Sequence, residues 1–392
     1  MDEPAWWPGG ITESSFEDAI SDGYLRTAFG KSTVWDPSVA YDAAWWNTAP
    51  SEGTIWGEWP INVESTEVLA KRQNEVVVRL NQSMFAVIAP LECGDDVSRL
   101  VRHEPWRKAL QSTPLLLPIA GWSVTECDRV LVYPWHERVE FADGNEAASE
   151  LMQQLATIHS SLAQTATPNT ERRWNDRLKA IEDQLKTKTM WRAPHSPTTV
   201  GLPQLHFSLT SLVKVDGKHC FLPCNRSFAE HMICEPDRLP SIAGAMMLEH
   251  QLARKEGLSE SQRRSLIETW AANVPEPWAN RAALSTVRGG AWVWRYHATL
   301  LAMAQAQAFG DESTYDDCLT WLQDVSRLQA HLGALRMWKS GTWIGLAGGV
   351  VSFFAWRLES MSPNQSTVLA LLSMGVIVAS NAVYRAKDPP PY

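Results

Sequence analysis

Two long runs without a charged residue lie near the C-terminus, and they constrain the fold more than any other part of the sequence. The runs cover residues 341–356 and 367–383. As α-helices with a rise of about 1.5 Å per residue they would each span roughly 25 Å, close to the thickness of a bilayer's hydrocarbon core. We therefore predict a transmembrane hairpin and short tail over residues 339–392. The alternative is a buried helical hairpin in a soluble core, because both runs are short for membrane spans.

The residues that flank the two runs predict how the hairpin lies in the lipid bilayer. Trp338, Trp343 and Trp356 suit the interface belt, where tryptophan rings are enriched. Basic residues lie outside the two runs, whereas the turn between them offers only Arg357 beside Glu359; the outer basic residues are Arg336, Lys339, Arg385 and Lys387. The positive-inside rule therefore predicts two crossings, with the main domain and both termini in the cytoplasm.

Small residues recur along the first run. Gly341, Gly345 and Gly349 follow each other at every fourth position, which places them on one face of a helix. Membrane helices associate where small side chains let two backbones approach closely. We predict that this face packs against a helix of a membrane protein partner; the alternative is that it seats the second span of the same chain.

Composition narrows the function of the remaining chain. A net charge of −9 argues against a nucleic-acid partner, which usually meets a basic surface. With 45% apolar and 20% charged residues, 392 residues can fold into two lobes with sizeable cores. The N-terminus has neither a basic segment nor an apolar run, so we expect no secretory signal and a cytoplasmic body. Five of the 20 tryptophans fall within residues 32–60, where we expect an extended arm packed on the body.

The six cysteines show no regular spacing, which is typical of free thiols in a reducing compartment. One cluster could ligate zinc, since it combines cysteines with histidines: His219, Cys220, Cys224, His231 and Cys234. Its paired cysteines fall on a predicted strand instead of a zinc knuckle. We therefore favour buried structural side chains here and predict no metal and no cofactor.

The middle of the chain alternates strands and helices in a recognisable order. Residues 75–80 and 84–89 predict a β-hairpin, 97–110 a helix, and 129–135 a strand. Helices are predicted over 151–162 and 172–186, followed by a loop and a second hairpin near residues 213–223, whose turn is Asp216-Gly217. Helical patterns fill residues 242–338, and an N-terminal helix is expected from Ser14 to Gly30.

The stretch from Leu205 to Cys224, Leu-His-Phe-Ser-Leu-Thr-Ser-Leu-Val-Lys-Val-Asp-Gly-Lys-His-Cys-Phe-Leu-Pro-Cys, resembles the catalytic core of kinase-like phosphotransferases of the aminoglycoside and choline kinase type. His206 takes the place of that family's loop histidine, and the run that ends at His159 is similar to the helix before this loop. The diagnostic residues are replaced: Ser208 stands at the catalytic aspartate, Leu212 or Val213 at the metal-binding asparagine, and Cys224 or Asn225 at the metal aspartate.

Two further positions of the family lie in the first lobe. Ile88, Ala89 or Pro90 stands near the place of the strand lysine, with Arg79 on the preceding strand as a substitute. Glu104 matches the helix glutamate that pairs with this lysine, although Pro105 is awkward inside a helix. Without its lysine, Glu104 should be solvated or paired locally.

The resemblance implies a two-lobed α+β protein-kinase-like fold. Its parts would be a Trp-rich arm (1–59), an N-lobe (60–136), a helical C-lobe (137–338) and the transmembrane hairpin (339–392). Phosphoryl transfer depends on positioning and on metal ions held by oxygen ligands. Ser208 cannot serve as a carboxylate base, and neither Leu212 nor Cys224 can hold magnesium through oxygen. We therefore predict a pseudokinase that serves as a scaffold or accessory subunit of a membrane complex. The alternatives are an active small-molecule or lipid phosphotransferase and an atypical membrane kinase-like ATPase.

Overall fold

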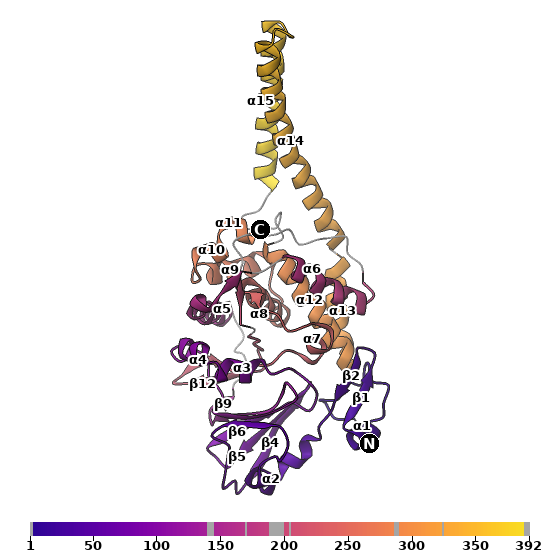
Figure 1. Ribbon diagram of the computed structural model, residues 1–392, viewed down its shortest axis with the longest axis vertical. Coiled ribbons are helices and arrows are strands. Elements are labelled where there is room, and N and C mark those ends of the chain that lie inside the picture. The colour runs from indigo at the N-terminus through magenta and orange to yellow at the C-terminus, as the bar shows by residue number, and fades with distance from the viewer. Residues whose placement is uncertain are drawn as a thin grey trace.

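The computed structural model describes residues 3–138, 145–168, 171–187, 200–203, 205–285, 290–323 and 325–387. Within these ranges the chain forms a β-rich lobe, a helical lobe and a long two-helix stalk that projects from the helical lobe (Figure 1). The mixed α+β, two-lobed arrangement is present, and its elements follow one another in the order that the resemblance implies. The predicted loop before residue 203 lies mostly outside the described residues.

A six-stranded antiparallel sheet organises the β-rich lobe. Its strand order is β3-β7-β8-β6-β5-β4, and its members are β3 (Thr54–Gly57), β4 (Thr66–Arg72), β5 (Glu75–Leu80), β6 (Met84–Ile88), β7 (Ala120–Val124) and β8 (Cys127–Pro134). The first predicted hairpin is confirmed, because β5 pairs with β6 from Leu80 opposite Met84 to Val76 opposite Ile88. Branched side chains suit this position, since Val76, Val77 and Val78 are completely buried.

The helix predicted over residues 97–110 is two helices. They are α3 (Asp96–Arg102) and α4 (Glu104–Leu110), and His103 between them is extended. Pro105 explains the break, because within a continuous helix its ring would clash with the preceding turn. In the first turn of α4 it is tolerated, since that position needs no intrahelical N–H donor.

The helical lobe contains α5 (Asn145–Ser161), α6 (Glu171–Gln184), α7 (Phe228–Ile233), α8 (Ser241–Glu256), α9 (Glu260–Ala271), α10 (Glu276–Ala279), α11 (Arg281–Leu284), α12 (Gly290–Phe309) and α13 (Glu312–Gln323). Local signals fix two of these boundaries. Gly257 ends α8 in the left-handed conformation (φ 62°), and Ser259 with Gln262 forms a capping box at the start of α9.

Within this lobe, α12 is the central helix, buried along nearly its whole length. His159 of α5 is a core histidine, as predicted. Its Nδ1 accepts a hydrogen bond from Trp270 Nε1 at 3.1 Å, and burial lowers its pKa to about 3.

Small sheets complete the helical lobe. The second predicted hairpin is confirmed as β12 (Leu212–Val215) and β13 (Lys218–Phe221), with β9 (Glu137–Arg138) along the other edge of β12. Its turn residues Asp216 (φ 49°) and Gly217 (φ 79°) both adopt the left-handed conformation that a tight hairpin turn requires. A second small sheet joins β10 (Thr167–Pro168), β11 (Val200–Leu202) and β14 (Leu239–Pro240).

The N-terminal arm differs from its prediction. The helix expected from Ser14 to Gly30 is only α1 (Phe16–Asp22), capped by Ser15 and ended by Gly23 at φ 72°. The chain then forms the hairpin β1 (Tyr24–Thr27) and β2 (Gly30–Thr33), a 3-10 helix η1 (Pro37–Tyr41) and α2 (Ala43–Thr48). The tryptophan segment is therefore partly helical instead of extended throughout.

The arm joins the two lobes, and packing on the body is confirmed. Trp6 and Trp7 belong to one buried cluster with Val76 of the sheet and with Ala304 and Ala308 of α12. Trp46 is fully buried and donates to the carbonyl of Ala40 at 2.9 Å. The tryptophans of this segment thus fill a core that the arm shares with both lobes.

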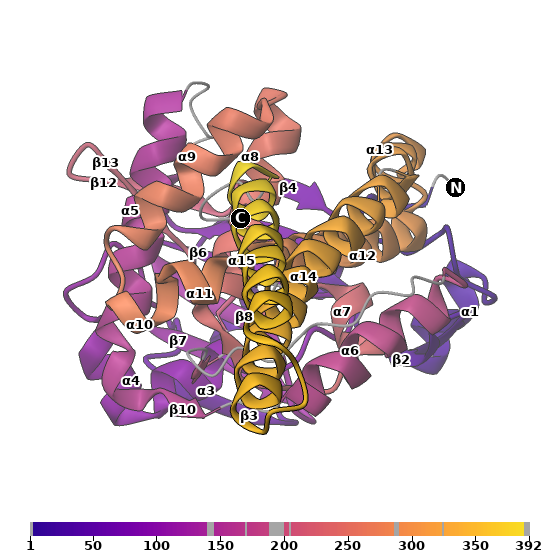
Figure 2. The same ribbon diagram turned by 90° about the horizontal axis from the view of Figure 1, so that it is seen from above.

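The stalk is an antiparallel pair of long helices, α14 (Val325–Arg357) and α15 (Pro363–Lys387). Seen from above, it stands over the body (Figure 2). The predicted boundary at residue 339 falls inside α14, which runs from the body into the stalk without a break, so the helix expected up to Trp338 is α13 followed by the base of α14. Large apolar side chains point outward, for example Phe354 (57% exposed) and Leu371 (65% exposed).

Among the described residues, one helix is long and apolar enough to cross a membrane, and it is α15. The second crossing, through α14, stays a prediction, as do the cytoplasmic termini. The proposed belt residues Trp343 and Trp356 are exposed on α14, whereas Trp338 is partly buried.

Of the three glycines on the predicted packing face, Gly341 and Gly345 lie against α15. A Cβ at Gly345 would come within 2.8 Å of the Ser373 carbonyl oxygen, and a Cβ at Gly341 within 2.5 Å of Ser380 Oγ. Gly349 faces open space. The glycine face therefore seats the second helix of the same chain at Gly341 and Gly345, which was the alternative interpretation.

Candidate functional site

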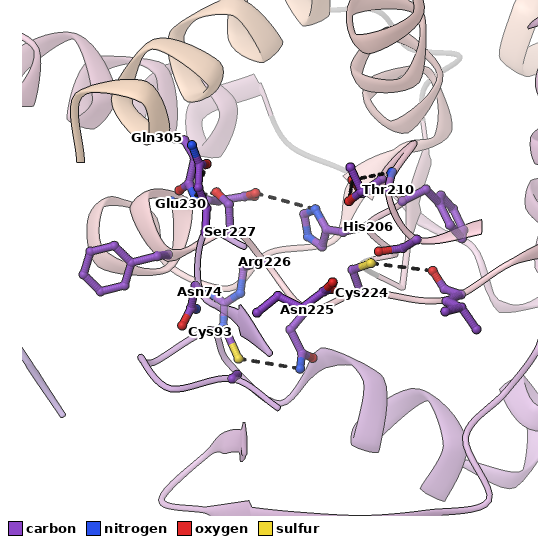
Figure 3. Close-up of a pocket in the computed structure, with 18 of the residues that line it drawn as sticks. Asn74, Cys93, His206, Thr210, Cys224, Asn225, Arg226, Ser227, Glu230 and Gln305 are labelled. Atoms are coloured by element: carbon purple, nitrogen blue, oxygen red, sulfur yellow. Dashed lines mark hydrogen bonds and ion pairs between the residues drawn. The ribbon is translucent and has the colours of Figure 1, made fainter. Parts of the chain in front are cut away.

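A cavity of about 460 Å³ lies between the two lobes. The turn between β4 and β5, with parts of β6 and β8, forms one wall, and α8, α12 and the segments 206–211 and 222–230 form the other. Figure 3 shows His206 of the first segment beside Cys224 of the second. The cavity is therefore at the position where the resemblance places the phosphotransferase site.

The predicted catalytic loop borders this cavity. Cys224 N–H donates to the carbonyl of His206 at 2.9 Å, so the loop and the segment after β13 are held together. Gln251 of α8 fixes the loop, because it accepts from Leu209 N–H at 3.1 Å and donates to the Phe207 carbonyl at 3.0 Å. At the place of the catalytic aspartate, the hydroxyl of Ser208 lies 2.9 Å from that of Thr210.

Val213, the residue matched to the metal-binding asparagine, does not line the cavity. Strand β12 begins at Leu212, and both Leu212 and Val213 are completely buried in the core. Ser211, directly before the strand, lines the cavity instead. Sequence spacing alone therefore did not identify the residue of this segment that reaches the cavity.

Cys224 and Asn225 both line the cavity where the metal aspartate was expected. Cys224 Sγ lies 3.6 Å from the carbonyl oxygen of Leu222. The Asn225 amide accepts from Val97 N–H at 2.9 Å and donates toward Cys93 Sγ at 3.7 Å. Asn225 therefore ties the segment after β13 to α3, whereas the Cys224 thiol contacts its own segment.

The local pairing expected for Glu104 is confirmed. Glu104 is exposed and lies 2.6 Å from Lys108 one turn along α4, which is the local pairing expected without a lysine partner. The ion pair between the lobes joins Asp96 of α3 to Arg226, whose Nε lies 3.0 Å from Asp96 Oδ2, and both side chains are buried. Arg79, the suggested substitute cation, pairs with Glu67 on the surface of the sheet.

A buried polar network beside the cavity escaped the sequence analysis. Glu230 of α7 is 1% exposed, forms an ion pair with Arg177 of α6, and has its second oxygen 3.5 Å from His206 Nδ1. Arg177 also donates to His297 Nε2 at 3.0 Å, and burial together with the charge of Arg177 lowers the pKa of His297 well below its usual value. Of this network, the sequence analysis had singled out only His206, because the other members are distant from it along the chain.

The mouth of the cavity is tied across the lobes by the turn between β4 and β5. Arg72 donates to the carbonyl of Thr210 at 2.8 Å, and Gln305 of α12 lies 3.5 Å from Gln73. Asn74 accepts from Leu91 N–H at 2.7 Å. This turn is therefore held against the helical lobe.

The possible zinc cluster is dispersed. His219 lies 4.0 Å from Glu150, and His231 lies 3.7 Å from Glu92. Among the residues that the structure describes, no group of three or more His, Cys, Asp or Glu side chains could hold a metal ion.

No protein-family model and no curated protein matches the chain. Among solved structures it is similar to glucosamine kinase in complex with glucosamine, ADP and inorganic phosphate, at 12% identity and a TM-score of 0.44, over 78% of this chain and 89% of that one. It is also similar to Plasmodium vivax ethanolamine kinase, at 10% identity and a TM-score of 0.40, over 67% and 82% of the two chains.

A third similar structure is the GDP complex of a mutant aminoglycoside 2'-phosphotransferase-IIIa, at 10% identity and a TM-score of 0.38, over 67% and 92% of the two chains. At these values the similarity is a loose one in the arrangement of elements. It says nothing about the activity of this chain.

Proposed function

We propose that this protein is a membrane-anchored pseudokinase, which serves as a scaffold or accessory subunit of a membrane protein complex. The observation that carries the proposal is that the buried charged groups beside the interlobe cavity are paired with each other. Asp96 is paired with Arg226, and Glu230 with Arg177, so these buried charges neutralise each other within the protein. Phosphoryl transfer instead needs charges that are directed at the phosphates and at metal ions.

The tied turn at the cavity mouth supports the same function. In kinase-like enzymes the two lobes move relative to each other around the nucleotide. Here Arg72 bonds to the loop of the opposite lobe, and the N-terminal arm places Trp6 and Trp7 in a core shared by both lobes. These contacts favour a body with a fixed shape, which suits a binding platform better than a catalytic cycle.

The stalk supports the membrane part of the proposal. Its exposed apolar side chains would be costly in water and favourable in lipid, and α15 has the length and apolarity of a span. We further propose that the partner is a membrane protein bound through the stalk. Because Gly341 and Gly345 are occupied by α15, the partner would use the open positions, such as Gly349 and Gly375.

Purified full-length protein in lipid nanodiscs, incubated with magnesium-ATP, tests the absence of catalysis. We expect no phosphate release above that of empty nanodiscs, and at best weak nucleotide binding that does not depend on magnesium. Acceptors in the assay should include an aminoglycoside, ethanolamine and the nanodisc lipids. Turnover that disappears in a Ser208→Ala or Asn225→Ala variant would contradict the proposal and favour an active phosphotransferase.

A further inference from the structure

The interlobe cavity contains polar atoms that the protein itself leaves without partners. His206 Nε2 and His250 Nε2 are buried and have no hydrogen-bond partner among the described residues. The two residues are 7% and 8% exposed, come from the loop and from α8 respectively, and both line the cavity. Buried polar atoms in native proteins nearly always have a hydrogen-bond partner. Two unpaired nitrogens in one cavity therefore indicate that a bound molecule supplies the missing partner.

The geometry fixes which hydrogen-bonding role His206 offers. Its Nδ1 faces Glu230 Oε2 at 3.5 Å, which favours a proton on Nδ1. In the neutral form of this tautomer, the Nε2 atom presents a lone pair to the cavity, where it can accept a hydrogen bond. Figure 3 shows the His206 ring between Glu230 and the segment that carries Cys224. A ligand that satisfies His206 therefore needs an O–H or N–H donor.

His250 adds a second imidazole to the cavity wall. Burial and the charges of Arg263, Arg254 and Arg295 lower its pKa to about 3, so the ring is uncharged at neutral pH. A neutral imidazole nitrogen either donates or accepts, depending on its tautomer. A hydroxyl group suits either imidazole, because it can both donate and accept a hydrogen bond.

The other residues that line the cavity disfavour a charged ligand. About half of the wall residues are apolar, and those that the argument uses are Val87, Leu131, Phe207, Leu222, Met247 and Leu301. Arg226 is neutralised by Asp96, and Glu230 by Arg177. An anionic ligand would lose its hydration without gaining a free cation from these pairs.

We propose that the interlobe cavity binds an uncharged, mainly apolar small molecule with a hydroxyl group, held by His206 and His250. A volume of about 460 Å³ is within the range of small-molecule pockets. The inference does not depend on a scaffold role, since binding is measured separately from phosphate transfer and from partner capture.

The test uses 2-naphthol as the probe, with 2-methylnaphthalene and 2-naphthoate as matched compounds that replace its hydroxyl by a methyl group or a carboxylate. Binding to the full-length protein in nanodiscs is measured by equilibrium dialysis, with empty nanodiscs as the blank. We expect saturable binding of one 2-naphthol per chain. Affinity for 2-methylnaphthalene should be about tenfold lower, corresponding to about 1.4 kcal/mol for one net hydrogen bond, and 2-naphthoate should not compete.

Variants locate the site. His250→Leu and His206→Leu should each remove most of the preference for 2-naphthol over 2-methylnaphthalene, while Met247→Leu, which changes the same wall without an imidazole, should keep it. Ala302→Phe, which fills the cavity from α12, should abolish binding of both compounds and provides a test if a histidine variant fails to fold.

Three outcomes would overturn the proposal. Equal affinity for 2-naphthol and 2-methylnaphthalene would mean that water satisfies the imidazoles. Binding that survives Ala302→Phe would place the probe elsewhere. Displacement of 2-naphthol by magnesium-ATP, with an affinity that increases with the number of phosphates, would identify a nucleotide site instead.

Discussion

Arg226 and Asp96 form a buried ion pair between the lobes, with Arg226 Nε 3.0 Å from Asp96 Oδ2. Arg226 comes from the segment after β13, in the helical lobe, and Asp96 begins α3 in the β-rich lobe. The backbone N–H of Arg226 also lies 3.3 Å from the same carboxylate oxygen, and its guanidinium reaches the carbonyl of Cys234. One side chain thus connects α3, the segment after β13 and the end of α7.

Removing one member of this pair should destabilise the body strongly. Asp96→Asn leaves the buried Arg226 without its counter-charge, and we expect the free energy of unfolding to fall by about 3–5 kcal/mol. Chemical denaturation followed by tryptophan fluorescence measures this change. The double variant Asp96→Asn with Arg226→Met should recover part of the loss, because it removes the uncompensated charge. A double variant no more stable than Asp96→Asn alone would mean that Arg226 acts through other contacts.

The hairpin should open when Gly345 carries a large side chain. Gly341→Cys with Ser380→Cys provides the readout, because a Cβ at residue 341 would lie 3.4 Å from Ser380 Cβ, close to the separation in a disulfide. We expect this pair to cross-link on oxidation and Gly345→Leu to reduce the yield severalfold, since its side chain would collide with Ser373 and Ile377. Gly349→Leu is the matched control and should leave the yield unchanged, because nothing lies near that position.

Gly349→Leu also tests whether the stalk binds a membrane protein partner. Gly349→Leu should keep the protein in the membrane but reduce the amount of any membrane protein that co-purifies with it. Leu358→Ala, at the turn, serves as the comparison for a general loss of apolar surface. Unchanged co-purification with Gly349→Leu and with Gly375→Leu would leave the stalk as an anchor without an assembly role.

Two membrane crossings predict opposite sides for the turn and the C-terminus. A cysteine at Ser360 should react with an impermeant thiol reagent added to intact cells, whereas a cysteine at Tyr392 should react only after the membrane is permeabilised. Labelling is compared with the unchanged chain, whose own cysteines provide the background. Labelling of Tyr392→Cys in intact cells would contradict the cytoplasmic C-terminus.

The buried histidines should make the body sensitive to acid. Burial lowers the pKa of His159 and of His250 to about 3, whereas both should titrate near 6.5 when unfolded. As the pH falls from 6.5 toward 3, the unfolded chain binds protons that the folded chain rejects, so stability decreases. Each histidine contributes about 1.4 kcal/mol per pH unit.

His250→Leu removes one of these contributions. Its free energy of unfolding should therefore depend less steeply on pH between about 6 and 4 than that of the unchanged protein, by about 1.4 kcal/mol per unit. Met247→Leu, a neighbour on the same helix without a titratable group, should keep the original slope. Parallel curves for all three proteins would show that His250 is protonated when folded.

Much of the fold was predictable because its signals are local. The hairpin of β5 and β6, the Asp216-Gly217 turn and the Ser259 cap each depend on residues close together in the sequence. The site was less predictable because its groups come from distant segments: Arg177 and Glu230 are separated by 53 positions, and Arg226 and Asp96 by 130. Val213 was assigned from sequence spacing alone and lies buried in β12, and the break between α3 and α4 at His103 was not predicted.

The uninterrupted path of α14 has a mechanical consequence. Its 33 residues form a rod about 50 Å long that begins in the helical lobe and ends at the far turn of the stalk. Because the helix has no break, it transmits tilt and rotation from one end to the other. A force applied at the far turn would therefore reorient the body and its cavity together.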